Sequence, residues 1–168
     1  MFDAVLLTVF PVLVAYAGAS DLFTMTIPNR VSILLASAFL FVGLLTGLSG
    51  QDWGMHFLGG AIVFVACFCM FAFGWMGGGD AKIASAIALW FGFTSSLLDF
   101  VLLTAIYGMF LTIGLLLFRK WPILPLFLSR LEWVSRLHDK ETGIPYGIAI
   151  SIAALQVYAS SEWFILIG

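Results

Sequence analysis

Residues 97–118 have the sequence LLDFVLLTAIYGMFLTIGLLLF, in which Asp99 is the only charged residue. The hydrocarbon core of a bilayer is about 30 Å thick, and an α-helix of about 20 predominantly apolar residues crosses it. Because the backbone N–H and C=O groups find no water inside that core, a single spanning segment must pair them within a helix. This stretch therefore predicts a transmembrane helix.

The composition of the whole chain also indicates a membrane protein. Of its 168 residues, 62% are hydrophobic and 10% are charged, and the mean hydropathy is +1.13. A soluble domain contains about 25% charged residues, so the composition excludes a water-soluble globule. The formal net charge of −2 is too small to indicate a nucleic-acid partner. Cys67 and Cys69 lie in an apolar run and predict core packing, not a disulfide framework or a zinc site.

Six apolar runs divide the chain, and five of them are long enough to cross a membrane as helices. The fourth run has 14 residues. Together the runs predict an all-α fold: a polytopic integral membrane protein with about six transmembrane helices in a single domain, residues 1–168, without a separate soluble domain. The runs are Phe2–Ser20, Val31–Ser49, Met55–Met76, Lys82–Ser95, Leu97–Phe118 and Gly143–Ile167.

The distribution of basic residues favours six crossings and gives their orientation. All seven Lys and Arg residues fall in the first, third and fifth connections, and the opposite side carries none. Because basic residues collect on the cytoplasmic side, we expect these connections in the cytoplasm and both termini outside. If the fourth run did not cross, the five basic residues from Arg119 to Lys140 would face away from Arg30 and Lys82. The first run follows Met-Phe-Asp, which has no positive charge, so we expect it to remain as a span and not to be cleaved as a signal peptide.

The longest connection, 119–142, contains an amphipathic segment. Residues 126–137 have the sequence LFLSRLEWVSRL, in which apolar residues recur at three- and four-residue spacing. That spacing places them on one face of a helix. We therefore expect an interfacial helix on the cytoplasmic membrane surface between spans five and six. Its apolar residues are Phe127, Leu128, Leu131, Val134 and Leu137.

Two acidic residues are candidate functional groups, because ionisable residues at or within membrane spans are costly and mark functional sites. Asp21 ends the first run and Asp80 opens the fourth, and the predicted topology puts both on the cytoplasmic side. Taken singly, each also has a structural explanation. Asp21 could be an ordinary membrane-edge carboxylate, and Asp80 could cap its helix by accepting backbone N–H bonds.

The neighbours of the two acids are also distinctive. Gly77–Gly79 precede Asp80, and three successive glycines allow a positive φ and a close approach to another part of the chain. Pro28 and Asn29 follow Asp21, and these residue types are common in turns, so they could simply start the second helix.

Two carboxyl groups on one membrane face, brought together by helix packing, are what an aspartyl protease requires. Like charges a few ångströms apart cannot both ionise, so one acid keeps its proton while the other stays charged. The charged acid can take a proton from the attacking water, and the protonated acid can polarise the amide carbonyl and later protonate the leaving amine. Lys82 could pair with a substrate carboxylate, bias the charge of Asp80, or only extend its amine to the interface.

Three stretches resemble the prepilin peptidases, and most of all the short TadV/CpaA-type members that serve Flp (Tad) pilus systems. The resemblance implies a polytopic aspartyl endopeptidase, and because the residues supply no metal site we expect no cofactor or metal. It also implies that the enzyme cleaves the short basic leader of prepilins or pseudopilins, which precedes a hydrophobic helix, at the cytoplasmic face of the bacterial inner membrane. The stretches are Ser20-Asp21 with Ile27–Asn29, Gly77–Lys82 with Ala88–Gly92, and Ile144–Ile150.

By the same resemblance, Asp21 and Asp80 are the catalytic acids, and Gly77 and Gly79 are the glycines of the GxGD motif. Longer prepilin peptidases carry paired Cys-x-x-Cys motifs and also methylate the new pilin N-terminus. This chain has no Cys-x-x-Cys, so we expect peptidase activity without a methyltransferase domain. The expected supporting residues are Gly77, Gly78, Gly79, Pro28 and Asn29, with Lys82 as a residue that contacts the substrate or tunes the acids.

The residues fit other functional classes less well. His56 and His138 are far apart, on opposite predicted faces and outside any H-E-x-x-H, so a metalloprotease is not indicated. Gly47–Gly50 matches the G-x-S-G of rhomboid-like serine proteases, but it ends a span on the outer side, and we expect a loop there. The non-enzyme alternative is a small transporter or channel subunit in which Asp21 and Asp80 carry protons or cations.

The predicted topology can be tested by thiol labelling of a chain in which Cys67 and Cys69 are replaced by Ser. We expect Ser129→Cys to resist a membrane-impermeant reagent in intact spheroplasts and to react after permeabilisation, because residue 129 lies in the connection predicted to be cytoplasmic. Gln51→Cys, in a connection predicted to be outside, should show the opposite pattern. Labelling of residue 129 in intact spheroplasts would contradict the topology.

Overall fold

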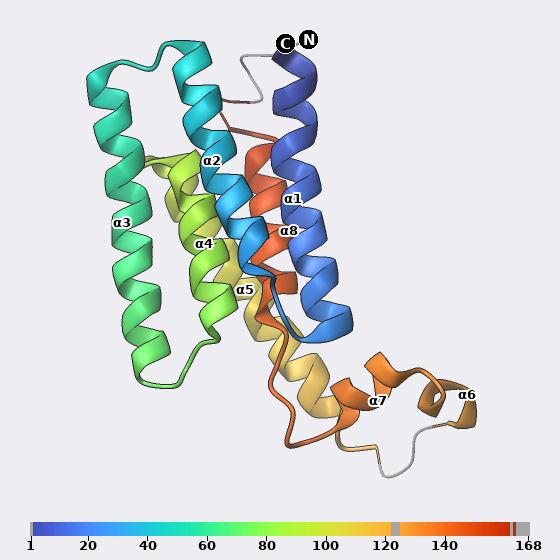
Figure 1. Cartoon of the computed structure of the whole chain (residues 1–168). Helices are drawn as coiled ribbons and strands as arrows, with labels where there is room; N and C mark the ends of the chain where they lie inside the picture. Colours follow the sequence, from blue (N-terminus) through green and yellow to red (C-terminus); the bar gives the residue numbers. More distant parts are fainter. Residues whose placement is uncertain (1, 122–124, 162, 164–168) are drawn as a thin grey trace.

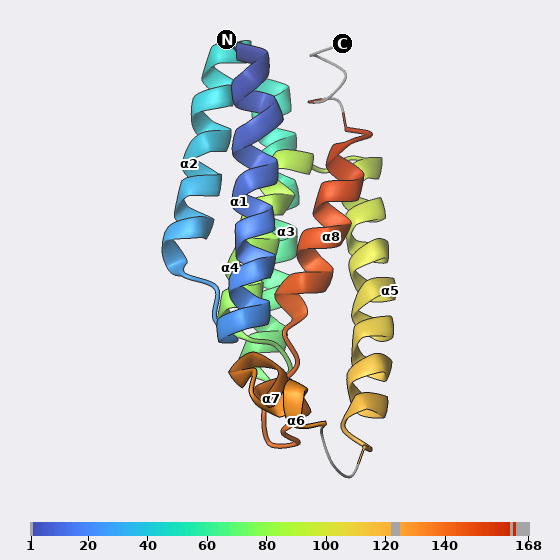
Figure 2. The same cartoon turned by 90° about the vertical axis from the view of Figure 1, so that its right-hand side faces the viewer.

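The computed structural model describes residues 2–121, 125–161 and 163, and they form a bundle of helices (Figure 1). The expected all-α fold is confirmed for these residues. Helices α1 to α5 and α8 run side by side, and the short α6 and α7 lie at the end of the bundle where α1 ends and α4 begins (Figures 1 and 2). The elements are α1 (Phe2–Thr24), α2 (Asn29–Thr46), α3 (Gly50–Ala72), α4 (Gly78–Phe91), α5 (Ser95–Phe118), α6 (Leu126–Ser129), α7 (Glu132–His138) and α8 (Tyr146–Tyr158).

Helix α4 occupies the interior of the bundle, where it contacts α2, α3 and α8. Its side chains Ile83, Ile87 and Trp90 are fully buried. The indole Nε1 of Trp90 donates a hydrogen bond to the Leu35 carbonyl of α2 at 3.0 Å. The ring of Trp90 also packs edge-on against Phe10 of α1, with 5.1 Å between the ring centroids. This packing fixes α4, and with it Asp80 in its first turn, relative to α1 and α2.

The outward faces of the bundle helices are apolar. Leu44 of α2 is 73% exposed and Phe110 of α5 is 63% exposed, and many other large apolar side chains are exposed. Such a surface is unfavourable in water and suits contact with lipid. By length and composition, α2, α3 and α5 can each cross a membrane, and the apolar helices Thr8–Thr24 and Tyr146–Tyr158 are shorter. The structure thus supports a membrane protein, and the six crossings stay a prediction.

The G-x-S-G sequence forms the turn between α2 and α3. Gly47 ends α2 with a left-handed φ of 67°, a conformation that glycine adopts without steric cost. Ser49 caps α3: its hydroxyl accepts the Asp52 backbone N–H, and the Asp52 carboxylate accepts the Ser49 N–H. This reciprocal pair is a capping box, so these residues have a structural role, as the sequence predicted.

Residues 126–137 do not form the single amphipathic helix that the sequence predicted. The structure divides them into α6 and α7, because Leu131 adopts an extended backbone with φ −91° and ψ 107°. Val134 and Leu137 are buried in α7, which contacts α1 and α5. The apolar face of α7 therefore packs on the bundle. The side chain of Phe127, another residue of the expected face, lies outside the described residues.

The last predicted span, 143–167, contains a shorter helix than expected. Helix α8 has 13 residues and ends at Tyr158. The Ser161 hydroxyl donates back to the Tyr158 carbonyl at 2.8 Å, and such local bonds compete with continuation of a helix. Ile167, where the predicted span ended, lies outside the described residues.

Helices α3 and α4 meet so closely at one point that a side chain cannot be added. A Cβ on Gly59 would lie 2.6 Å from the carbonyl carbon of Gly92, and backbone cannot move aside easily. We expect Gly59→Ala to lower the Tm of the purified protein in detergent, because overpacking costs about 1–3 kcal/mol.

The matched control is Gly54→Ala on the same helix, where an added Cβ would meet no described atom within 4 Å. This variant should keep or slightly raise the Tm. Equal melting temperatures for the two variants would contradict the close contact.

Candidate active site

The first acid, Asp21, lies in the last turn of α1 and is only 6% exposed. The helix ends where Met25 takes a left-handed φ of 55° and donates its N–H to the Asp21 carbonyl at 2.8 Å. Beyond this turn, Ile27 is buried and Pro28 forms the N-cap of α2. The abrupt end of α1 leaves the Asp21 carboxyl group at the helix terminus, next to the start of α8.

The Asp21 carboxyl group accepts a backbone hydrogen bond from α8. The Gly147 N–H donates to its Oδ2 atom at 2.8 Å, across 126 residues of sequence. The first N–H groups of a helix lack partners within the helix and carry partial positive charge, so they stabilise a negative group there. A Cβ on residue 147 would lie 2.7 Å from that oxygen and 2.8 Å from Cδ1 of Ile27. Only glycine leaves room for this contact.

The second acid, Asp80, is the third residue of α4 and is partly exposed. It does not cap the helix: Gly77 holds the N-cap position, without a side-chain hydrogen bond. Gly77–Gly79 do not use the positive φ that glycine allows, since the positive φ in the turn before α4 belongs to Gly74, at 74°. The expected close approach is present, because a Cβ on Gly79 would lie 3.3 Å from Cβ of Ile27.

Asp21 and Asp80 line the same two adjoining cavities, of about 250 Å³ and 430 Å³. Both cavities also include Met25 and Gly77. The smaller cavity extends towards the first turn of α2 and the glycines before Asp80, and the larger one extends along the segment that leads into α8. The remaining lining residues are Thr26, Ile27, Asn29, Gly78 and Gly79 in the first, and Gly74, Trp75, Met76, Gly143, Ile144, Pro145 and Tyr146 in the second.

Lys82 lines neither of the two cavities, but it contacts a residue that does. Its Nζ atom donates to Oδ1 of Asn29 at 3.0 Å, which joins the starts of α2 and α4. Asn29 lines the smaller of the two cavities. The contact links Lys82 to a residue of that cavity, and the expected role of Lys82 towards the substrate or the acids stays a prediction.

A buried arginine, Arg119, holds the segment that leads into α8. Sequence reasoning had counted this residue only among the basic residues of the connections predicted to be cytoplasmic. Arg119 is 8% exposed. Its Nε donates to the Leu137 carbonyl at 2.8 Å, and its Nη2 donates to the Thr142 and Gly143 carbonyls at 2.9 Å each. These bonds tie the end of α5 to the chain just before Pro145, and so help to place the Gly147 N–H.

Sequence reasoning also missed the Gly147 N–H itself. Its only signal was that the residue belongs to the Ile144–Ile150 stretch of the family resemblance. Every residue except proline has a backbone N–H, so no side-chain pattern identifies the one that meets Asp21. The neighbouring Tyr146 also holds the start of α8 in place, because its hydroxyl lies within hydrogen-bond distance, 2.8 Å, of Oγ1 of Thr112 on α5.

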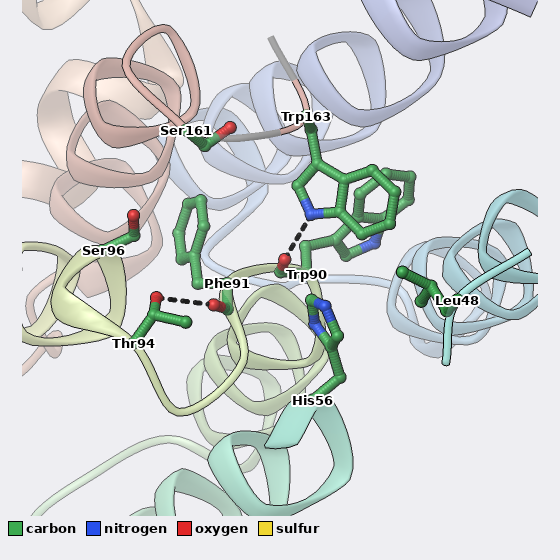
Figure 3. Close-up of a pocket in the computed structure, with 8 residues that line it drawn as sticks. All are labelled: Leu48, His56, Trp90, Phe91, Thr94, Ser96, Ser161 and Trp163. Carbon is green, nitrogen blue, oxygen red and sulfur yellow. Dashed lines mark hydrogen bonds between the residues drawn. The ribbon is translucent and has the colours of Figure 1, made fainter. Parts of the chain in front are cut away.

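The two histidines lie in different places. His56 lies within hydrogen-bond distance of the Leu89 carbonyl, 2.7 Å from its Nδ1, and borders a cavity of about 70 Å³ with Trp90 and Trp163 (Figure 3). His138 lies at the end of α7, with its Nε2 3.0 Å from the Trp121 carbonyl. In the described part of the chain, no group of three or more His, Cys, Asp or Glu side chains is placed to hold a metal ion.

Comparison with known proteins identifies the family. The model of the type IV leader peptidase family matches residues 8–117, a range that runs from α1 to α5 and includes Asp21 and Asp80. No curated protein and no solved structure matches the chain significantly. The match covers more than half of the chain and confirms the resemblance to the prepilin peptidases. The chain therefore belongs to the type IV leader peptidase family, and it is a peptidase built as a helical membrane protein.

Proposed function

We propose that this protein is an aspartyl endopeptidase that removes the short basic leader of Flp-type prepilins or pseudopilins, with Asp21 and Asp80 as its catalytic acids. The observation that carries the proposal is that the two acids, 59 positions apart in sequence, line the same two cavities. The family match supports a leader peptidase. It gives no support to the alternative of a transporter or channel subunit.

The proposed chemistry assigns a different role to each acid. Both carboxyl groups belong to residues that line the same two cavities, and in the proposed mechanism they hold one proton between them. Asp21 accepts the Gly147 N–H at the positive end of α8, which favours its charged form. We therefore assign Asp21 as the base that takes a proton from the attacking water. Asp80 is then the acid that polarises the scissile carbonyl and protonates the leaving amine.

The proposal includes six crossings, with both termini outside and the acids at the cytoplasmic face of the inner membrane. It is supported by the seven basic residues, all of which fall in connections predicted to share one side. It is also supported by the place of Asp21 and Asp80 at the end of the bundle where the connection with α6 and α7 lies (Figure 1). A precursor leader that is basic would itself be retained on the cytoplasmic side, so substrate and acids would meet there.

The first test replaces each acid in turn and follows cleavage of a leader-bearing Flp-type precursor. Asp21→Asn and Asp80→Asn preserve shape but cannot share a proton between two carboxyl groups, so we expect either to lower kcat roughly 1,000-fold or more. The double variant should be hardly worse, because residues that act as a unit are not additive. The wild-type enzyme should have a bell-shaped pH profile that reports the pair.

The control is Asp99→Asn, at the exposed start of α5, which should cleave at the wild-type rate. All variants must be present in the membrane at similar levels. If Asp21→Asn still trims the precursor under these conditions, the assignment of the two acids is wrong.

The second test addresses the contact between α8 and Asp21. In Gly147→Ala the added Cβ would lie 2.7 Å from Oδ2 of Asp21, so the carboxyl group must move. We expect kcat for the precursor to fall at least roughly tenfold, because small displacements of a reacting group are costly.

Gly114→Ala on α5 is the control, since Gly114 lines neither cavity at the acids and an added Cβ there would meet no described atom within 4 Å. Measuring the Tm of both variants separates a displaced acid from an unfolded protein. If Gly147→Ala and Gly114→Ala process the precursor equally well, the contact plays no part in the reaction.

A further inference from the structure

An apolar groove lies on the surface of the bundle between α2, α3 and α4, on the side of α4 that carries Lys82. Its volume is about 610 Å³. The residues that line it are mostly apolar or small, and include Ala36 of α2, Ala61 of α3 and Ala86 of α4. Along α2 the groove extends from Asn29 to Ala36, which is two turns of helix or about 10 Å. This length matches about two turns of an apolar helix lying along the bundle.

The groove begins at the candidate active site. Asn29 lines both the groove and the smaller of the two cavities that contain Asp21 and Asp80. Lys82 lines the groove at the same end and is hydrogen-bonded to Asn29. A chain that leaves the acids past Asn29 therefore enters the groove directly, and from there it runs towards the opposite end of α4.

A second apolar groove on the bundle has no such connection. It lies between α1 and α2, has a volume of about 540 Å³, and is lined by residues that include Ser37 and Ala38. None of its described lining residues lines either cavity at the acids. Lipid chains would cover both grooves alike, whereas a substrate that reaches the acids has a reason to enter only the first.

We propose that the groove between α2, α3 and α4 binds the hydrophobic helix of the precursor while its leader is cleaved. This inference rests on the proposed function, which requires a substrate whose scissile bond lies between a basic leader and an apolar helix. With the scissile bond at Asp21 and Asp80, the apolar helix continues past Asn29 along α4. The small side chains of the groove let a helix approach closely, which is how helices associate in membranes.

The inference is tested by filling the groove and measuring KM for the full-length precursor. Ala61 is exposed and lines the groove, so Ala61→Phe adds bulk there without displacing the core. We expect KM to rise roughly tenfold with kcat changed much less, because binding energy is lost and not the chemistry. Two controls carry the same side chain elsewhere: Ala66→Phe, exposed on the same helix, and Ser37→Phe, in the groove between α1 and α2. Both should keep the wild-type KM.

A second measurement does not depend on turnover. A photo-crosslinking phenylalanine analogue is placed at position 61, 66 or 37 of the Asp80→Asn variant, in vesicles that also contain the uncleaved precursor. We expect an adduct with the precursor from position 61 and none from 66 or 37.

The outcomes distinguish failure of the proposed docking groove from failure of the proposed peptidase function. If the wild type cleaves the precursor but Ala61→Phe matches Ala66→Phe, or if position 61 forms adducts only with lipid, the docking surface is wrong and the peptidase assignment stands. An adduct from position 37 alone also overturns the inference, in favour of the other groove. If the wild type leaves the precursor intact, the proposed function fails and the inference fails with it.

Discussion

The hydrogen bond from the Gly147 N–H to the Asp21 carboxyl group constrains how the bundle is assembled. A buried carboxyl group without a partner is costly, and Asp21 is almost completely buried. The bond therefore requires the end of α1 and the start of α8 to lie side by side, although 126 residues separate the two partners. The same two helices approach closely again at Gly18, where a Cβ would lie 2.8 Å from Oγ of Ser151. Small residues at both points allow this contact.

The start of α4 also packs closely against the segment that follows α1. Glycines precede Asp80, and one of them, Gly79, comes so close to Ile27 that an added Cβ would lie 3.3 Å from its Cβ. Ile27 also lies close to Gly147, so this buried side chain lies between the start of α4, which carries Asp80, and the start of α8, which binds Asp21. Trp90 holds the far end of α4 through its bond to α2. The acids are thus positioned by packing along the whole helix and not by their own hydrogen bonds alone.

Much of this arrangement follows from the sequence, and the exceptions have physical reasons. Charged residues are so rare in this chain that the two acids with unusual neighbours were easy to identify. The apolar runs predicted the main helices, because their lengths depend on local composition. The break at Leu131 was not predictable, because α7 gains buried contacts with the bundle that no local pattern contains. The role of Arg119 was hidden for a similar reason: its charge indicates a membrane side, while its burial and its three carbonyl partners depend on tertiary structure.

Only part of the candidate site lies within the range that the family model matches. The matched range, 8–117, includes both acids but ends before Arg119 and before α8. The partner of the Asp21 carboxyl group and the residue that anchors the approach to α8 therefore come from the part of the chain beyond the match. A backbone N–H can be supplied by many sequences, provided that the helix start is held in place and residue 147 is glycine. The acids can thus be recognised by side-chain type, whereas the hydrogen bond that holds one of them depends on where the backbone of residue 147 lies.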